Sequence, residues 1–577
     1  MIDLATLNAA PAPEFVAALA SIFEHSPWVA QRVAHRRLFA SVLALHRALC
    51  DAVTQAPETE QVGLIRAHPE LAGRAATGGL TAASAGEQRR AGLTECTPHE
   101  LERLKSLNAA YARRIGFPFV LAVRGHTPQS VIAAMERRLT HTAREELGAA
   151  LHEIFNIARF RLADLVQEPL GNAIIAMADD LATLSEESGA LTCSYLTPTH
   201  VATAARIRDF MLAAGLDVHI DALGNVVGVL DAGGAATRRL LTGSHYDTVI
   251  NAGKYDGRLG VLLPIAVAGA LRRGGVRLPF PLEIIAFADE EGVRFKSTFL
   301  GSRALAGRFD PEALESVDAA GVSLRDALRA AGHDPAQIAA VARDPGHVLG
   351  FVEVHIEQGP VLLEAGLPVG VVTGIAGCVR SMVSVEGLSG HAGTVPMSLR
   401  HDAAAAAAEM VLQVEQRCRT EPGLVGTVGR FAVPGGSINV IPGLCEFSID
   451  VRSLEDGARD AADADIDAGI GRIAARRGVT VTRRRILEAA SVSCAGPLQD
   501  ALAASVERVT PGTAMRLPSG AGHDAMMMAG LTDVGMLFVR CGNGGISHHP
   551  AETLSAADAD VAARVFQDFL LHVRITA

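Results

Sequence analysis

The chain has 577 residues, is 49% hydrophobic and carries a formal net charge of −11; because a single core stops growing at roughly 250–300 residues, we expect about two to four domains. The longest apolar run, 259–271, is interrupted by Pro264 and falls short of the ~20 residues that cross a bilayer, and no basic stripe carries interleaved aromatic residues. We therefore expect no membrane and no nucleic acid as partners. The eight cysteines form no CxxC pair, and the N-terminus has no secretory pattern, so a cytoplasmic protein without a disulfide framework is predicted.

Residues 1–168 have the pattern of consecutive helices. Thr97 precedes a proline and is followed by Glu100 three positions on, which indicates a capped helix start. Thr127 is followed by Pro128 in the same way, and a last helix is expected over 143–166. No stretch alternates with period two. The sequence therefore predicts an all-α domain over 1–168.

After residue 168 the pattern changes to short aliphatic strands that alternate with helices, which is typical of a mostly parallel sheet covered by helices. The expected strands are 226–230, 239–242, 282–287 and 351–356, with helices at 201–214 and 260–273. A second texture has strands at 380–386, 426–432, 446–452 and 479–485 and helices at 402–418 and 455–477. We predict a multi-domain chain: an all-α domain, then an α/β domain over 172–377 and 493–577, interrupted by an α+β domain over 378–492.

Three of the predicted α/β strands end in groups that bind divalent ions. His245 follows the first strand, with Asp256 beyond it, Glu290 and Glu291 follow the second, and His355 lies at the end of the third. Ligands bind beyond the carboxyl ends of strands in open α/β sheets, so these groups should converge. Imidazole and carboxylate ligands without thiolates suit Zn²⁺ or Mn²⁺. One strand-end histidine alone would be ordinary, but three clusters together predict a metal site.

Six motifs carry a family resemblance: GSHYDTV, AGKYDGRLG, FADEEGVRF, HIEQGP, GLSGHAGTVPM and GISHHPAE. They are similar to the dinuclear-metal amidohydrolases of the M20 peptidase group, in the branch of N-carbamoyl-amino-acid hydrolases, ureidopropionase-like enzymes and allantoate amidohydrolases. The resemblance runs from about 172 to the C-terminus and implies two divalent cations, Zn or Mn, in the α/β domain. One cation would take His245, Asp256 and His355, and the other Asp256, Glu291 and His548.

The same resemblance implies roles for neighbouring residues. Asp247 would orient the imidazole of His245, and Glu290 would accept a proton from water and deliver it to the departing amine. The α+β insert would be a lid and dimerisation domain, which gives a homodimer. The substrate would be bound by Gln358, His391 from the partner subunit, Asn439, Arg452 and His523. Arg452 could equally be a surface strand arginine, and His523 could simply cap the following helix.

The N-terminal part carries a second resemblance. The segments HPELAGR from His68, SAGEQ from Ser84 and GFPFV from Gly116 are similar to the decarboxylase that acts on 2-oxo-4-hydroxy-4-carboxy-5-ureidoimidazoline (OHCU) and produces (S)-allantoin in urate breakdown. This implies an enzyme without metal, with His68 as acid and base and Glu87 as its carboxylate helper. The implied substrate contacts are Pro69, Ser84, Gln88, Phe119, Val120, Val123 and Arg161. Two plainer interpretations remain: Ser84-x-x-Glu87 is also a capping-box pattern, and His-Pro is a common turn.

The fusion of the two parts favours one substrate. A decarboxylase that makes allantoin suggests that the larger part hydrolyses allantoate, a ureido acid one ring-opening further on, to ureidoglycine, ammonia and CO₂. The alternatives are an N-carbamoyl-L-amino-acid hydrolase or ureidopropionase, and an inactive binding module of the same fold. Loss of a metal ligand would favour the inactive module, but every implied ligand is present. The expected partners are small ureide substrates and a second copy of the chain.

Overall fold

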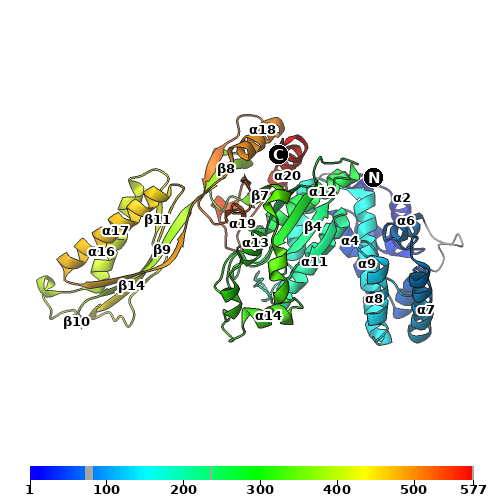
Figure 1. Ribbon diagram of the computed structural model, residues 1–577, viewed down its shortest axis with the longest axis horizontal. Helices are drawn as coiled ribbons and strands as arrows, with labels where there is room; N and C mark the ends of the chain where they lie inside the picture. Colours follow the sequence, from blue (N-terminus) through cyan, green and yellow to red (C-terminus); the bar gives the residue numbers. More distant parts are fainter. Residues whose placement is uncertain (72–81, 234–236, 575–577) are drawn as a thin grey trace.

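The computed structural model describes residues 1–71, 82–233 and 237–574 (Figure 1). The N-terminal region is a helical bundle, as predicted. Its helices are α1 (Leu4–Ala9), α2 (Ala12–Leu19), α3 (Trp28–Val33), α4 (Val42–Thr54), α5 (Glu58–Ala67), α6 (Ala82–Arg90), α7 (Pro98–Ile115), α8 (Pro128–Arg138) and α9 (Ala143–Leu165). Ala72, Gly73 and Arg74 of the HPELAGR segment lie outside the described residues.

Local sequence explains where the longer of these helices begin. Thr97, Thr127 and Thr142 each accept a hydrogen bond from the backbone amide three residues on, and the side chain at that position accepts one from the backbone amide of the threonine. These capping boxes satisfy amide groups that a helix start otherwise leaves unpaired. A two-residue strand pair, β1 (Ile2–Asp3) with β2 (Val166–Gln167), was not predicted and joins the two ends of the bundle.

The next region contains a nine-stranded mixed sheet in the order β16-β8-β18-β7-β5-β6-β4-β3, with β17 paired to β8. Its central strands β18, β7, β5 and β6 are mutually parallel, so their carboxyl ends meet at one edge. The strands are β3 (Asp217–Ile220), β4 (Val226–Leu230), β5 (Arg239–His245), β6 (Leu282–Phe287), β7 (Val348–Ile356), β8 (Val369–Ile375), β16 (Val492–Ser493), β17 (Arg516–Ser519) and β18 (Val534–Val539).

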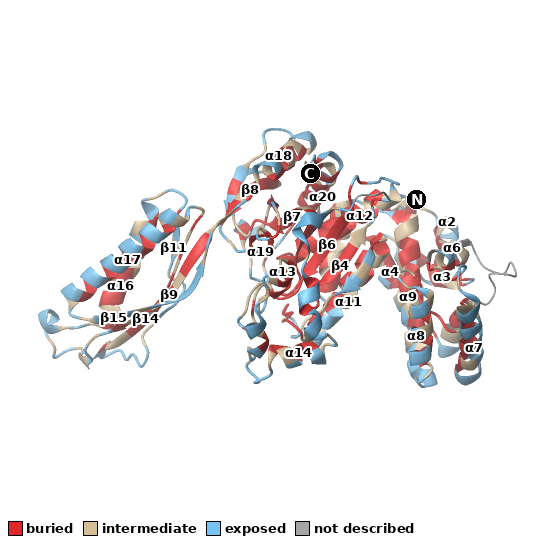
Figure 2. Ribbon diagram, in the orientation of Figure 1, coloured by how far each residue is buried: buried red, intermediate tan, exposed pale blue. Residues whose placement is uncertain are grey.

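Helices cover this sheet and complete the predicted α/β domain. Helix α12 packs on the three central strands β5, β6 and β7, while α19 packs on β7 and β18. The helices are α10 (Leu170–Leu181), α11 (Pro198–Ala214), α12 (Arg258–Arg273), α13 (Leu300–Leu305), α14 (Leu324–Ala330), α15 (Val361–Ala365), α18 (Gly496–Val509), α19 (Asp524–Met528) and α20 (Ala556–His572). Their buried faces and the sheet form the largest hydrophobic core (Figure 2).

The inserted region is an α+β unit that projects away from the sheet (Figure 1). One five-stranded antiparallel sheet is covered by two helices, and its strand β14 buries every second residue against them. The elements are β9 (Gly377–Glu386), β10 (Gly390–His391), α16 (Ala403–Arg419), β11 (Val425–Thr427), β12 (Phe431–Ala432), β13 (Val440–Ile441), β14 (Leu444–Ser453), α17 (Asp456–Arg477) and β15 (Thr480–Ala489).

One predicted strand of the insert was wrong. The stretch 426–432 is two short strands, β11 and β12, which both pair with β14 but at separate places along it. Between them the backbone amide of Arg430 donates to the hydroxyl of Ser448 rather than to a strand neighbour. Only two chain segments join the insert to the main sheet: the step from β8 to β9 at Ala376, and the step from β15 to β16 at residues 490–491.

The described residues form three separate hydrophobic cores. One belongs to the helical bundle and runs from Leu4 to Val166, with Ala213 added from the next region. The second belongs to the nine-stranded sheet, and the third belongs to the insert, from Val383 to Ala474. The exact domain boundaries remain a prediction, but each core is covered by its own elements.

Candidate active sites

The first candidate site lies where the central parallel strands end. His245 is the last residue of β5, Glu290 and Glu291 follow β6, and His355 is the second last residue of β7. Asp256 reaches the same place from the loop that precedes α12. The register of β5 with β6 and β7 brings these ends together, and the shared edge is where open α/β sheets bind ligands.

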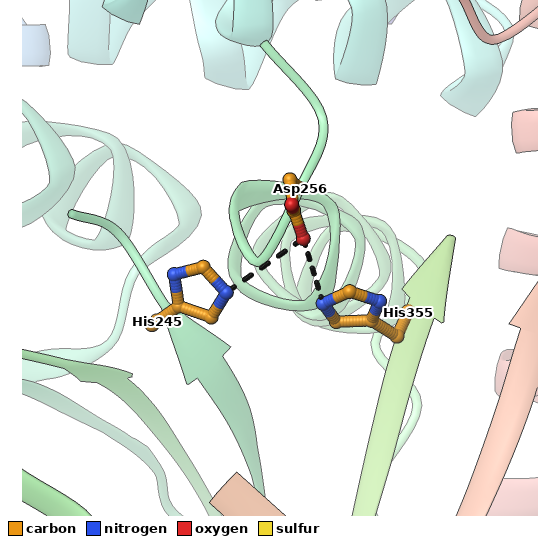
Figure 3. Close-up of side chains that lie close together, drawn as sticks. All are labelled: His245, Asp256 and His355. Atoms are coloured by element: carbon orange, nitrogen blue, oxygen red, sulfur yellow. Dashed lines mark ion pairs between the residues drawn. The ribbon is translucent and has the colours of Figure 1, made fainter. Parts of the chain in front are cut away.

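Asp256 is at the centre of this cluster (Figure 3). Its Oδ1 lies 3.8 Å from Nε2 of His245 and 3.3 Å from Nε2 of His355. The Nδ1 of His355 is 2.8 Å from the carbonyl of Ile356, which can only accept, so Nδ1 carries the proton and the lone pair is on Nε2. That lone pair lies on the side of Asp256, where it accepts a hydrogen bond from the backbone amide of Gly257, at 3.1 Å. A bound cation would take the place of this hydrogen bond.

A second group of possible ligands shares the same carboxylate. Nε2 of His548 is 3.0 Å from Oδ2 of Asp256 and 3.5 Å from Oε1 of Glu291. The neighbouring His549 instead accepts a hydrogen bond from the backbone amide of Ala551, so His548 is the histidine in the cluster. The two sets, His245–Asp256–His355 and Asp256–Glu291–His548, each bring their ligand atoms within 4.8 Å of one another. This donor chemistry fits divalent cations, and Asp256 contributes an oxygen atom to both sets.

Asp247 makes contacts that the sequence did not indicate. Its two carboxylate oxygens accept hydrogen bonds from the backbone amides of Glu290 and Glu291, at 3.1 and 3.2 Å. Nδ1 of His245 is 3.1 Å from the backbone carbonyl of Asp247 and 3.6 Å from its carboxylate. Asp247 therefore fixes the turn after β6 through its side chain and the His245 ring mainly through its backbone.

Glu290 lines the same cavity and is in neither Asp256-centred set, although it forms a third group of close ligand atoms with His245 and Glu291. Desolvation of its carboxyl raises the pKa well above the ordinary value; nearby His245 opposes that shift, and nearby Glu291 adds to it. A carboxyl with a raised pKa next to a cluster of metal ligands suits proton transfer near neutral pH.

The cavity around these groups has a volume of about 290 Å³ and receives residues from the insert. Arg380 and Arg452 lie on the paired strands β9 and β14, and both bind Asp450. Arg452 also donates to the carbonyl of Gly520, at 2.6 Å. Gln358 donates to Oδ2 of Asp256, at 2.9 Å. Arg452 and Gln358 thus line the cavity, as the resemblance implies.

Three other predicted residues lie elsewhere. His391 and Asn439 are exposed and sit on or next to the β10–β13 pair, at the tip of the insert far from the cavity (Figure 1). His523 is buried beside the metal ligands: its ring centroid is 4.5 Å from that of His355, and its Nε2 is 2.7 Å from the hydroxyl of Ser519. Burial lowers the pKa of His523 well below its ordinary value, so this imidazole is neutral.

The second candidate site is a cavity in the helical bundle. All nine residues that the second resemblance implies line it: His68, Pro69, Ser84, Glu87, Gln88, Phe119, Val120, Val123 and Arg161. His68 follows the last residue of α5, and its Nδ1 is 3.0 Å from the carbonyl of Leu64. Nδ1 must donate there, which leaves Nε2 with its lone pair and with no hydrogen-bond partner among residues 1–71, 82–233 and 237–574. Burial lowers the pKa of His68 to about 4.

Arg161 and Glu87 form the charged wall of this cavity. The Arg161 guanidinium donates to both oxygens of Glu87, at 3.0 and 3.1 Å, and to Glu24, at 2.8 Å. It also donates to the hydroxyl of Ser84, at 3.1 Å. Glu24 is a member of this network that sequence reasoning missed, because it lies on a different segment from every quoted motif. The structure ties Glu87 to Arg161 directly.

Comparison with known proteins decides the family. The model of the peptidase family M20/M25/M40 matches residues 241–572, which is more than half of the chain. The chain belongs to the M20 peptidase family. The OHCU decarboxylase model matches residues 8–163, so the chain joins an OHCU decarboxylase domain to an M20 hydrolase domain. It is an enzyme that combines a lyase domain with a hydrolase domain.

Individual relatives of the M20 domain carry several names, and they include a ureidoglycolate hydrolase of Arabidopsis thaliana, 34% identical over 443 residues, covering 75% of this chain and 92% of that protein. The chain is 40% identical over 437 residues to an allantoate deiminase of Arabidopsis thaliana, covering 70% of this chain and 83% of that protein. It is 42% identical over 380 residues to an N-carbamoyl-L-amino acid amidohydrolase of Geobacillus stearothermophilus, covering 66% and 92%. A crystal structure of a hydantoinase/carbamoylase family amidase from Burkholderia multivorans matches with TM-score 0.65 and 30% identity, covering 70% of this chain and 97% of that one.

Two further residues of the M20 cavity were missed by the sequence analysis. Arg303, on α13, and Arg380, on β9, both line it. Arg380 was detectable in part, because β9 and β14 were predicted and their alternation places Arg380 and Arg452 on one face. Arg303 gave no signal, since it follows no motif. Within the described part of the chain, no helix is both long and apolar enough to cross a membrane.

Proposed function

We propose that the chain is a bifunctional enzyme of ureide catabolism. The helical domain would decarboxylate OHCU to (S)-allantoin, and the M20 domain would hydrolyse allantoate to ureidoglycine, ammonia and CO₂. The observation that carries this proposal is the presence of an OHCU decarboxylase domain on the same chain as an M20 domain whose relatives include allantoate deiminases. The two substrates belong to the same chemical series, and one ring-opening step separates them.

In the M20 domain, His245, Asp256 and His355 would hold one divalent cation, and Asp256, Glu291 and His548 the other. When bound, such a pair supplies Lewis acidity, which polarises a carbonyl oxygen and acidifies water. The buried Asp247 keeps the turn that carries Glu290 and Glu291 in place through the two backbone amides. Zn²⁺ and Mn²⁺ both suit this imidazole and carboxylate set.

Glu290 would move the proton in the hydrolysis. It accepts a proton from the attacking water as the water oxygen bonds to the ureido carbonyl carbon. The bond from that carbon to the substituted nitrogen then breaks, and Glu290 delivers the proton to this nitrogen. Ureidoglycine leaves, and the remaining carbamate separates into ammonia and CO₂. The raised pKa of Glu290 suits both halves of this transfer.

The substrate carboxylate would be recognised by arginine. Arg303, Arg380 and Arg452 line the cavity that contains the metal ligands. An arginine guanidinium can pair with a carboxylate through two parallel hydrogen bonds, which fixes orientation as well as charge. Both allantoate and N-carbamoyl amino acids carry such a carboxylate beside the ureido group. The three arginines therefore support a ureido acid as the substrate. Other residues would have to distinguish the second ureido group of allantoate from an amino-acid side chain.

The tip of the insert supports a homodimer as the working form. His391 and Asn439 are exposed at the tip, beyond the reach of the cavity of their own chain. A second copy would place them over the partner's metal ligands, where His391 would donate a hydrogen bond to the developing oxyanion and Asn439 would bind substrate. Each M20 site would then be composed of two chains.

In the helical domain, His68 would be the acid and base. Its free Nε2 accepts a proton from the substrate, and loss of CO₂ leaves an electron pair on the ring carbon that receives this proton back. Arg161, held by Glu24 and Glu87, would provide fixed hydrogen bonds that keep the cavity in shape. No cation is needed for this sequence of steps.

A substrate panel tests the proposal. Ammonia release is measured from allantoate and from a set of N-carbamoyl-L-amino acids, with Zn²⁺, Mn²⁺ or Co²⁺ added, and CO₂ release is measured from OHCU. We expect allantoate to give the highest kcat/KM. A preference for an N-carbamoyl amino acid would favour the second candidate, an N-carbamoyl-L-amino-acid hydrolase, which the 42% identity to the Geobacillus stearothermophilus enzyme supports.

A further inference from the structure

A cavity of about 130 Å³ lies between the two catalytic domains and belongs to neither site. Its walls come from α4 and α9 of the helical domain and from α10, α11 and α12 of the M20 domain. Most of the lining is aliphatic and includes Leu43, Leu162, Met177 and Ile265. An apolar cavity of about 150 Å³ is large enough for a benzene molecule, so this one has room for a small organic ligand.

Several polar atoms of this cavity have no hydrogen-bond partner among the described residues. These are the buried Nε and Nη1 of Arg159 and the buried Oε2 of Glu168. The other carboxylate oxygen of Glu168 accepts from the backbone amide of Val42, at 3.1 Å. Arg273 also lines the cavity and has no ion pair within 4.0 Å among the described residues. A buried donor left unsatisfied costs about 1–3 kcal/mol, and more when it is charged. Asp180 and Asp209 act on Arg159, and Asp164 and Glu168 act on Arg273, only through longer-range electrostatics. Among the described residues no carboxylate forms an ion pair with either guanidinium, so both face the cavity without a direct counter-ion.

The charge balance favours an anion. Burial lowers the pKa of His46, on the cavity wall, to about 3, so this residue is neutral near pH 7. Burial raises the pKa of Glu168 to about 7, so its carboxyl is partly protonated there and can donate a hydrogen bond. Arg159 and Arg273 stay charged, so the residues that line the cavity carry a net positive charge among aliphatic side chains, while Asp164, Asp180 and Asp209 lie outside the lining.

We propose that this cavity binds a short-chain carboxylate, with the carboxylate on Arg159 and Arg273 and the hydrocarbon chain among the aliphatic residues. The volume suits a chain of about four to six carbons. The ligand would satisfy the free Nε and Nη1 of Arg159 with charge-assisted hydrogen bonds. This assignment does not depend on which ureide either domain uses.

The cavity is held in shape by ion pairs across the domain interface. Asp164 of α9 binds both Arg124, at 2.8 Å, and Arg272 of α12. Asp180 of α10 binds Arg206 of the same domain and Arg47 of α4. These contacts define how the two domains dock, so the cavity between them has a fixed form.

The position of the cavity relates it to both active sites. Arg159 lies on α9 two residues before Arg161, whose guanidinium lies in the decarboxylase cavity. Arg273 is the last residue of α12, and α12 begins at Arg258, just after the shared metal ligand Asp256. A ligand here contacts one helix from each catalytic site.

Calorimetric titration of the full-length chain tests the proposal with defined probes. Hexanoate and butanoate are compared with hexanamide, which lacks the charge, and with acetate, which lacks the chain. We expect saturable binding of hexanoate, at least tenfold weaker binding of acetate, and no binding of hexanamide. Binding of none of the carboxylates to the wild-type chain, or acetate as tight as hexanoate, would overturn the proposal.

Two variants locate the site. Arg159→Met removes the charge and keeps the length, and should weaken hexanoate binding at least tenfold, as expected for lost charge-assisted bonds. Ala173→Leu adds bulk to the cavity wall and keeps every charge, and should also abolish binding. Arg103→Met, which removes an exposed arginine of α7 far from the cavity lining, is the matched control. Both catalytic activities report whether each variant is folded. Hexanoate binding that survives Ala173→Leu would place the ligand elsewhere and refute the assignment.

Discussion

The two catalytic domains use the same side chains, histidine and glutamate, at very different densities. In the helical domain the Nε2 of His68 has no hydrogen-bond partner among the described residues, and the nearby Glu24 and Glu87 both pair with Arg161. In the M20 domain three histidines share one buried aspartate, and further carboxylates surround them. A single buried neutral imidazole with an unpaired nitrogen is suited to proton transfer. Several buried carboxylates that lie close together with imidazoles are suited to binding cations, which balance the negative charge. The number of histidine and carboxylate side chains that lie together, rather than their type, distinguishes proton transfer in the helical domain from metal binding in the M20 domain.

Chelation is the broadest test of this contrast. Treatment of the full-length chain with EDTA should abolish ammonia release from allantoate, because the crowded carboxylates lose the cations that organise them. Decarboxylation of OHCU by the same sample should be unchanged. Both rates are measured before and after dialysis, and added Zn²⁺ or Mn²⁺ should restore the hydrolysis. Loss of decarboxylation on chelation would contradict the division of chemistry between the domains.

Glu290→Gln should give the next largest effect. The amide keeps the shape of the side chain but cannot accept a proton, so hydrolysis of allantoate should fall by about 10²–10⁴. Metal content, measured by mass spectrometry, should stay at the wild-type value because Glu290 is outside both Asp256-centred ligand sets. The decarboxylase rate of the same variant is the internal control. Retained turnover would remove Glu290 from the mechanism.

Heterodimers distinguish a site made of two chains from one made of a single chain. His391→Ala and Glu290→Gln are each expected to inactivate hydrolysis. A heterodimer of the two, isolated with a different tag on each chain, has one intact composite site and should recover roughly half of the wild-type rate. The matched control pairs Glu290→Gln with His355→Ala, which leaves both sites defective. Decarboxylation should be normal in every combination, and equal inactivity of the two heterodimers would argue against a composite site.

Arg452→Ala tests the carboxylate contact. The substrate would lose a charge-assisted partner worth about 1.5–3 kcal/mol, so kcat/KM for allantoate should drop roughly 10- to 100-fold, mostly through KM. Arg430→Ala is the control, because Arg430 is an exposed arginine that contacts Glu446 on β14 outside the cavity. An unchanged kcat/KM for Arg452→Ala would show that another residue, such as Arg303, holds the carboxylate.

The smallest expected effect is that of pH on the rate of decarboxylation. Burial lowers the pKa of His68 to about 4, so the neutral form required for proton acceptance predominates above that pH. The rate should therefore vary by less than about 20% between pH 7 and pH 5 and fall as the pH drops through about 4. An imidazole with an ordinary pKa of about 6.5 would instead lose most of its activity over the same interval. A rate profile of the full-length chain at constant ionic strength separates the two cases.

Much of both sites was accessible from sequence because local rules place the residues. Strand ends followed by His245, Glu291 or His355 converge whenever the strands are parallel, and that arrangement could be predicted from the alternation of strands and helices. The contacts of Asp247 could not, since they depend on how the turn after β6 folds back. Arg303 and Glu24 were missed because they reach their cavities through tertiary packing alone. The interdomain cavity depends on the docking of two complete domains, which no local pattern records.

The insert is joined to the main sheet by only two chain segments, so a small rotation at these segments produces a large displacement at its tip. The ten residues of β9 extend over roughly 33 Å, from the junction at Gly377 toward the tip that carries His391. A rotation of about 10° at Ala376 and residues 490–491 would displace a point that far away by about 6 Å. Arg380 and Arg452, which lie close to the pivot, would shift far less. A small motion at one pair of backbone crossings would therefore move His391 by several ångströms, and would withdraw it from a partner's site in the proposed dimer, while the two arginines keep their place in the cavity.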